Sequence, residues 1–187
     1  MAFLRTLTFR PAIHRLRILT ATILFVAVAF SFVGSAQAGP AGEYQVKAAF
    51  LFNFAKFVSW PPHAFPDANT PFVIGVLGQD PFGSHLDDTV RGERINNRQL
   101  VVRRYHSAAE INNCQVLFIS RSESDRLDQI VGVLKNRALL IVTDAEAGKR
   151  GVIIRFVTEG NRIRFRIDAD AAKAANLTIS SKLLRLG

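Results

Sequence analysis

The chain has 187 residues, of which 49% are hydrophobic and 21% charged, a composition typical of a globular protein and not of a disordered one. Its one cysteine excludes an internal disulfide, and its four histidines with that cysteine exclude a clustered zinc site. The net charge is +9, but the first 38 residues contribute four arginines and no acid, so the remainder is only mildly basic and nucleic acid is not an expected partner.

Residues 1–38 have the organisation of a secretory signal peptide. The arginines precede the apolar run Ile18–Val33, which is followed by the small residues of Ala36-Gln37-Ala38. This order predicts cleavage after Ala38 and export of a single domain, residues 39–187. An uncleaved membrane anchor is the alternative, but the apolar run is shorter than the about 20 residues that a spanning helix needs.

A helix rich in aromatic residues is predicted over Glu43–Val58. Its apolar positions recur at helical spacing: Val46, Phe50, Phe54 and Phe57. Lys47 belongs to its polar remainder, and Trp60-Pro61-Pro62 ends the helix because proline disfavours helical geometry in the residue before it. Core packing explains the aromatic residues. A hydrophobic surface or ligand pocket formed by Phe50, Phe54, Phe57 and Trp60 is the alternative.

Apolar strands and helices alternate in the next part of the chain. The predicted strands are Phe72–Leu77, Gln99–Tyr105, Cys114–Ile119 and Ala138–Val142. The predicted helical segments are Phe82–Val90 with Asp80 as its cap, a short turn over Ala108–Asn113, and a helix from a capping box at Ser120 to about Leu134. This alternation predicts a single α/β domain with a mostly parallel central sheet flanked by helices.

The pattern then changes to a C-terminal β-hairpin and helix. The hairpin strands are Val152–Thr158 and Arg162–Asp168, and Asp168 is predicted to cap a helix to about Asn176. The second strand has one basic face formed by Arg162, Arg164 and Arg166. An ordinary solvated face and an electrostatic docking surface both explain these arginines. Leu183, Leu184 and Leu186 in the tail fit either the core of the domain or a partner interface.

The residues show no pattern typical of an active site. His63, His85 and His106 lack the spacing of metal ligands, and the chain has neither a G-x-S-x-G nucleophile motif nor a phosphate-binding loop. Cys114, whose thiol is unpaired, is the first residue of a predicted buried strand, so packing is its expected role. We therefore expect no enzymatic activity, no metal and no cofactor, and an envelope enzyme is the least favoured hypothesis.

Four stretches together resemble the YfiR family of periplasmic proteins: YQVKAAFLFNFAKFVSWP at 44–61, VLGQDPFG at 76–83, CQVLFIS at 114–120 and LTISSKLLRL at 177–186. The resemblance implies a regulator that binds the periplasmic sensory region of an inner-membrane diguanylate cyclase, represses it and so lowers cyclic di-GMP and biofilm formation. It also implies a homodimer, and an outer-membrane lipoprotein that relieves the repression. A sensor kinase is the alternative membrane partner.

The chain departs from the family pattern in its cysteines. Cys114 resembles one half of a cysteine pair whose mate would fall in the first strand, but Phe72–Leu77 contains no cysteine. An intramolecular redox switch is therefore not expected. The runner-up hypothesis is a periplasmic domain that binds a small hydrophobic or aromatic ligand and is coupled to a sensor kinase, because the strand ends of an α/β sheet commonly form pockets.

Overall fold

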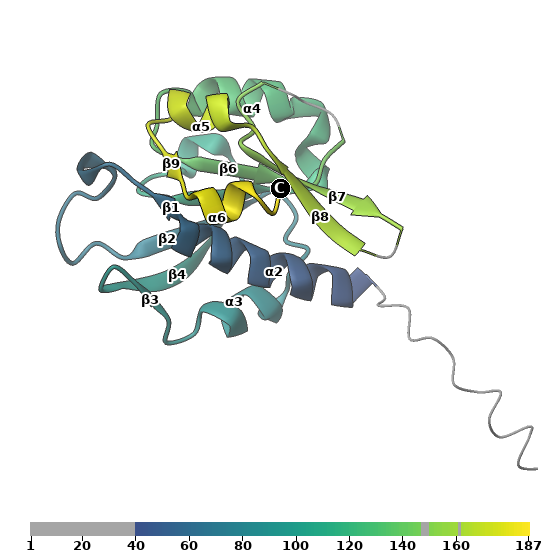
Figure 1. Cartoon of the computed structure of the whole chain (residues 1–187), viewed down its shortest axis with the longest axis horizontal. Coiled ribbons are helices and arrows are strands. Elements are labelled where there is room, and N and C mark those ends of the chain that lie inside the picture. Colours follow the sequence, from purple (N-terminus) through teal and green to yellow (C-terminus); the bar gives the residue numbers. More distant parts are fainter. Residues whose placement is uncertain (1–39, 147–149, 161) are drawn as a thin grey trace, which may run out of the picture. The chain divides into compact units, whose positions relative to one another are not determined.

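A computed structural model describes residues 40–146, 150–160 and 162–187. The predicted signal peptide, residues 1–38, lies outside them. In the described residues a central sheet carries helices on both of its faces (Figure 1). Its strands, in spatial order, are β3 (Arg94–Ile95), β4 (Arg98–Tyr105), β2 (Phe72–Leu77), β5 (Val116–Ile119), β6 (Leu140–Thr143), β7 (Ile154–Glu159) and β8 (Arg162–Ile167).

The pairing of the strands confirms the predicted fold class. The five strands from β4 to β7 in this order are parallel to one another, whereas the edge strands β3 and β8 are antiparallel to their neighbours. The hairpin and the helix after it are both present. A separate two-stranded antiparallel sheet joins β1 (Val58–Ser59) to β9 (Thr178–Ile179) and so connects the end of the first helix to the C-terminal region.

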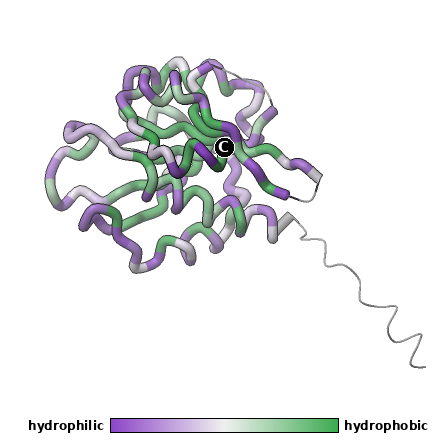
Figure 2. The backbone as a smooth tube through the Cα atoms, in the orientation of Figure 1, coloured by the Kyte–Doolittle hydropathy of each residue, from purple (hydrophilic) through white to green (hydrophobic). Residues whose placement is uncertain are grey.

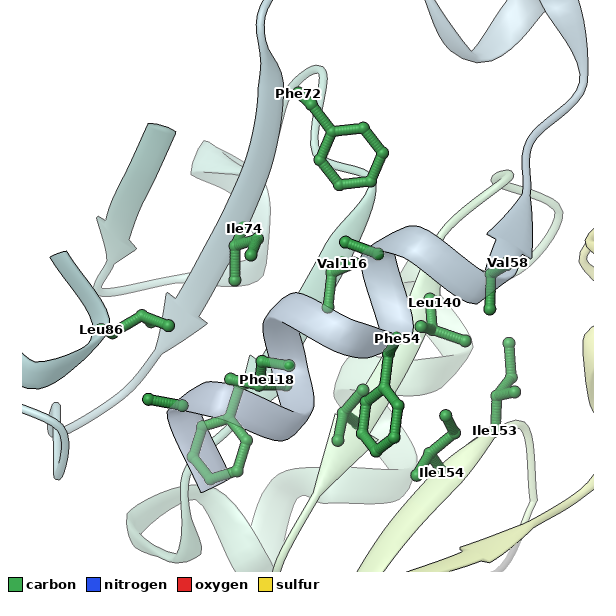
Figure 3. Packing of buried hydrophobic residues seen from close by; sticks show 14 of the residues in the cluster. Phe54, Val58, Phe72, Ile74, Leu86, Val116, Phe118, Leu140, Ile153 and Ile154 are labelled. Carbon is green, nitrogen blue, oxygen red and sulfur yellow. The ribbon is translucent and has the colours of Figure 1, made fainter. Parts of the chain in front are cut away.

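Two hydrophobic cores lie on opposite faces of the sheet. The helices are α2 (Pro40–Phe57), α3 (Ser84–Val90), α4 (Leu127–Leu134), α5 (Ala169–Ala174) and α6 (Ser181–Leu184), with 3-10 turns η2 (Pro62–Ala64), η3 (Ala108–Glu110) and η4 (Arg121–Arg126). Residues of α2, α3, α5 and α6 contribute to one core, and α4 covers the other. Figure 3 shows Phe54 directed from α2 onto the strands that carry Leu140 and Ile154.

The central strands are apolar throughout because both of their faces are covered. Every residue of β2, β5 and β6 is buried. In β5, Val116 and Phe118 point into the core under α2, while Leu117 and Ile119 point into the core under α4. Figure 2 shows the same contrast along the chain, with hydrophobic central strands and a hydrophilic tip of the β7–β8 hairpin.

Several local predictions are corrected by the structure. Helix α3 begins at Ser84, and Asp80 does not cap it; Oδ1 of Asp80 instead accepts a hydrogen bond from the amide of Phe82 at 2.7 Å in the turn before the helix. The strand expected from Cys114 begins at Val116, and the short edge strand β3 was not predicted. The segment after Ser120 forms η4 before α4 begins. The cap of α5 by Asp168 is confirmed.

Candidate functional site

The arginines of β8 lie on a hairpin at the edge of the sheet. Strand β7 pairs with β6 only through Ile154 and Arg155, so the rest of β7 pairs with β8 alone and the hairpin projects beyond the other strands (Figure 1). Phe165 is buried, whereas Arg162, Arg164 and Arg166 are exposed. The predicted alternation of a basic and an apolar face is therefore confirmed.

The exposed face of this hairpin carries an excess of positive charge. Arg166 lies opposite Arg155 and Arg162 lies opposite Glu159, which places four arginines and one glutamate on the same face. The carboxylate of Glu159 lies 3.1 Å from Nε of Arg164 and 3.9 Å from a guanidinium nitrogen of Arg166. Because these side chains are more than half exposed, the ion pairs add little stability, and the guanidinium groups of Arg162, Arg164 and Arg166 remain accessible to a partner.

The C-terminal tail packs on the other side of β8. A β-carbon placed on Gly187 would lie 2.8 Å from Cγ1 of Ile167, so the end of the chain touches the apolar face of the strand. Leu183 is buried in the core, whereas Leu184 and Leu186 are 41% and 69% exposed. Of the two explanations for the tail, core packing applies to Leu183, and the other two leucines remain available to a partner.

The outer edge of β8 is therefore flanked by arginines on one face and by the tail on the other. Within the described residues, β8 pairs with β7 and with no other strand. We call this edge, with Arg162, Arg164, Arg166, Leu184 and Leu186, the docking edge. An edge strand presents unpaired backbone N–H and C=O groups, to which an extended segment of another protein can pair.

The aromatic residues of α2 mostly fill the core. Phe54 is fully buried, and its ring centroid lies 5.0 Å from that of Phe165. Phe50 is half-buried and lies 5.4 Å from Phe165. Trp60 donates from Nε1 to the carbonyl oxygen of Gln115 at 3.2 Å and packs edge-on against Phe72. These rings connect α2 to the hairpin and to β2.

The buried face of α2 differs from the predicted one. Val46 and Phe57, expected to point inward, are 44% and 37% exposed. Lys47, assigned to the polar remainder, is instead buried. The inward residues are Lys47, Ala48, Leu51, Phe54 and Ala55. Phenylalanines at several angles around the helix obscured the periodicity from which the face was predicted.

Lys47 belongs to a buried polar cluster at the carboxyl end of β6. Its Nζ lies 2.6 Å from Oδ2 of Asp144 and 2.6 Å from Oε1 of Glu43. Tyr44 donates its hydroxyl proton to the same oxygen of Asp144 at 2.9 Å, and burial together with this carboxylate raises the pKa of Tyr44. Arg121 donates from Nε to the backbone oxygen of Asp144 at 3.0 Å. The cluster fastens α2 to the sheet.

The usual ligand position of an open α/β sheet is filled in this protein. Chain order reverses around β2, and ligands commonly bind outside the carboxyl ends of the strands at such a point. Here Gly78, which follows β2 with φ of 89°, lies so close to η4 that a β-carbon would be 2.5 Å from Oγ of Ser122. The hollow beside η4 measures only about 120 Å³. The described residues also contain no cluster of metal-ligating side chains.

Cys114 is a free thiol whose sulfur is turned toward the sheet. The sulfur donates to the carbonyl oxygen of Val116 at 3.1 Å and packs over Gly75 of β2. Burial raises the pKa of the Cys114 thiol to about 12. The thiolate, which is the reactive form, is therefore scarce at neutral pH.

Comparison with known protein families identifies the chain. The sequence pattern of a family described as YfiR/HmsC-like matches residues 44–187, which is more than half of the chain and includes both the hairpin and the tail. The chain belongs to the YfiR/HmsC-like family. No protein with a curated description matches it. The YfiR family is periplasmic and regulatory, and the described residues include no helix long and apolar enough to cross a membrane.

Proposed function

We propose that the chain is exported, loses residues 1–38, and represses an inner-membrane diguanylate cyclase by binding the periplasmic sensory region of that enzyme. Its presence then lowers cyclic di-GMP and biofilm formation, and it carries out no catalysis and holds no cofactor. Membership of the YfiR/HmsC-like family supports this regulatory role. The observation that carries the proposal is the docking edge, an open strand flanked by exposed arginines and leucines.

The chemistry of the docking edge defines the segment that it binds. Strand pairing with β8 supplies the backbone hydrogen bonds, which hold an extended segment without regard to its sequence. Arg162, Arg164 and Arg166 select carboxylates at alternate positions of that segment, because guanidinium groups form charge-assisted, bidentate hydrogen bonds with carboxylates. We therefore expect the sensory region to present an acidic strand to β8.

Repression requires that the two conformations of the sensor bind the repressor differently. A repressor with equal affinity for the active and inactive sensor shifts nothing, however tightly it binds. The acidic strand is therefore accessible in the inactive sensor and paired internally in the active one. An outer-membrane lipoprotein that covers the docking edge relieves repression by competition.

Photo-crosslinking in living cells tests this assignment. The photoreactive residue p-benzoylphenylalanine replaces Arg164 on β8 or, as the control, Arg91, which is also exposed but follows α3. We expect a crosslink from position 164, but not from position 91, to a membrane protein with a diguanylate cyclase domain. A crosslink from position 164 to a sensor kinase would show that the partner is a sensor kinase and not a cyclase. The absence of any membrane protein would overturn the proposal.

A further inference from the structure

A groove of about 730 Å³ is lined by residues of α4, α5 and the starts of β6 and β7, and none of the residues of the docking edge lines it. Its floor is apolar and is formed by Leu139, Ile141 and Ile153, while Ala171 and Ala174 contribute to the wall on the α5 side. The volume lies within the range of about 300–1,000 Å³ typical of small-molecule sites. The groove is thus large enough for a ligand and has an apolar surface to bury against it.

One end of the groove is positively charged. Helix α4 leads from β5 back to the start of β6, so the residues that follow its last turn lie at the amino end of β6. Lys135 and Arg137 line the groove there. The side chain of Lys135 is exposed, and its ammonium group has neither a hydrogen-bond nor an ion-pair partner in the part of the chain that the structure describes. Arg137 donates to the carbonyl oxygen of Ile111 at 2.6 Å and has no carboxylate partner among those residues.

Three carboxylates, those of Asp128, Asp168 and Asp170, also line the groove. Asp128 is in the first turn of α4, about 10 Å from Lys135 along the helix axis. The amide of Asp168 donates to the carbonyl oxygen of Ile153, which places the start of α5 beside the middle of the floor. Asp168 caps α5 through Oδ1, and Asp170 lies 3.5 Å from Lys173. Two of the three carboxylates therefore have partners within the protein, whereas the ammonium group of Lys135 has none among the described residues.

We propose that this groove binds a small organic carboxylate with an apolar body, such as a medium-chain fatty acid. Its carboxylate contacts Lys135 and Arg137, and its hydrocarbon part lies on Leu139 and Ile141. The apolar lining of the groove, in which Ala171 is half-buried and Ala174 exposed, buries the hydrocarbon part, and the unpartnered charge at one end selects an anion over a cation of the same length. This site is separate from the docking edge, and its existence does not depend on the proposed repression of a cyclase.

Thermal unfolding and calorimetry with decanoate test the site, with decylamine as the cation of the same chain length. Bound ligand stabilises the folded state, so we expect decanoate to raise the melting temperature with saturation and decylamine to have no such effect. Lys135→Glu should weaken decanoate binding about tenfold, the size expected for one lost hydrogen bond to a charged group. Lys182→Glu, a charge reversal on α6 at an exposed lysine outside the groove, should leave binding unchanged.

A second pair of variants tests whether the ligand occupies the groove. Ala174 is exposed, so Ala174→Trp fills the groove without disturbing the core, and Ala174→Ser is the control at the same position. We expect Ala174→Trp to abolish decanoate binding and Ala174→Ser to retain it, with unliganded circular dichroism confirming that each variant is folded. If Ala174→Trp does not fold, Lys135→Glu decides the question. The proposal would be overturned if decylamine raised the melting temperature as much as decanoate does. It would also be overturned if Lys135→Glu, or a folded Ala174→Trp variant, bound decanoate as well as the wild type does.

Discussion

Nζ of Lys47 lies 2.6 Å from Oδ2 of Asp144, and both side chains are only 1% exposed. Lys47 is in α2 and Asp144 is in the loop after β6, so their ion pair joins parts of the chain that are far apart in the sequence. Two opposite charges can be buried together because each compensates the other, but either one alone is costly to keep away from water.

Removing one member of this pair should therefore destabilise the protein strongly. We expect Lys47→Met to lower the free energy of unfolding by about 3–5 kcal/mol, because the buried carboxylate of Asp144 loses its nearest cation. The double variant Lys47→Met with Asp144→Leu should lose less than Lys47→Met alone, since it removes both members of the fully buried pair. Urea denaturation of the three proteins measures both quantities. A double variant less stable than Lys47→Met would contradict this account.

Two phenylalanines of α2 should respond differently to truncation. Phe54 is fully buried against Phe156 and Phe165, so Phe54→Ala should cost about 3–5 kcal/mol through lost burial and a residual cavity. Phe57 is 37% exposed, and Phe57→Ala should cost less than about 2 kcal/mol. Chemical denaturation compares them directly. Similar losses for the two variants would show that the rings do not divide into a core and a surface group.

The strands were more predictable from the sequence than the buried face of α2. Strand β2 was predicted to the residue, because burial on both faces leaves an unbroken apolar run between polar turns. In α2 the same reasoning predicted that Lys47 is exposed, because the sequence around this lysine does not reveal the carboxylate with which it pairs. That partner, Asp144, lies 97 positions away, after the predicted strand Ala138–Val142. Only the order of the strands brings the two together.

Of the docking edge, the sequence predicted the basic face but not its place in the fold. Alternation along Arg162, Arg164 and Arg166 is local, so the basic face was evident from spacing alone. Its position beside the C-terminal tail was not, because the contact of Gly187 with Ile167 depends on how α5 and α6 fold back over the sheet. The groove between α4 and α5 could not be found for the same reason, since its walls come from separate parts of the chain.

The thiol of Cys114 should be unreactive in the folded protein. Its pKa is raised to about 12 by burial, whereas the thiol of the unfolded chain has the ordinary value of 9.0. Between these values the unfolded state releases a proton that the folded state retains, so this group destabilises the fold progressively as the pH rises above 9. At pH 7.5 we expect iodoacetamide to modify Cys114 rapidly in urea and slowly without it. Equal rates would contradict the buried position of the sulfur.

Acid should weaken the contact between α3 and β4. Arg104 hydrogen-bonds to Asp87 and lowers the pKa of this carboxyl below its ordinary value of 3.8. A lowered pKa in the folded state gives stability that is present above pH 3.8 and lost as the pH falls below it. The stability difference between the wild type and Asp87→Asn should thus be constant above about pH 5 and shrink below pH 4. Denaturation at several pH values measures it, and a difference that grows in acid would contradict the assignment.

Intracellular cyclic di-GMP tests the central claim most directly. A deletion strain is complemented with the wild type, with Arg162, Arg164 and Arg166 changed to Glu, or with the same change at Arg91, Arg126 and Lys173. These control residues are likewise exposed and, as Arg164 and Arg166 do, pair with carboxylates. With equal periplasmic amounts of each protein, we predict that deletion raises cyclic di-GMP and that the wild type and the control triple restore the low level, while the β8 triple does not. An unchanged level on deletion, or full restoration by the β8 triple, would contradict repression through the docking edge.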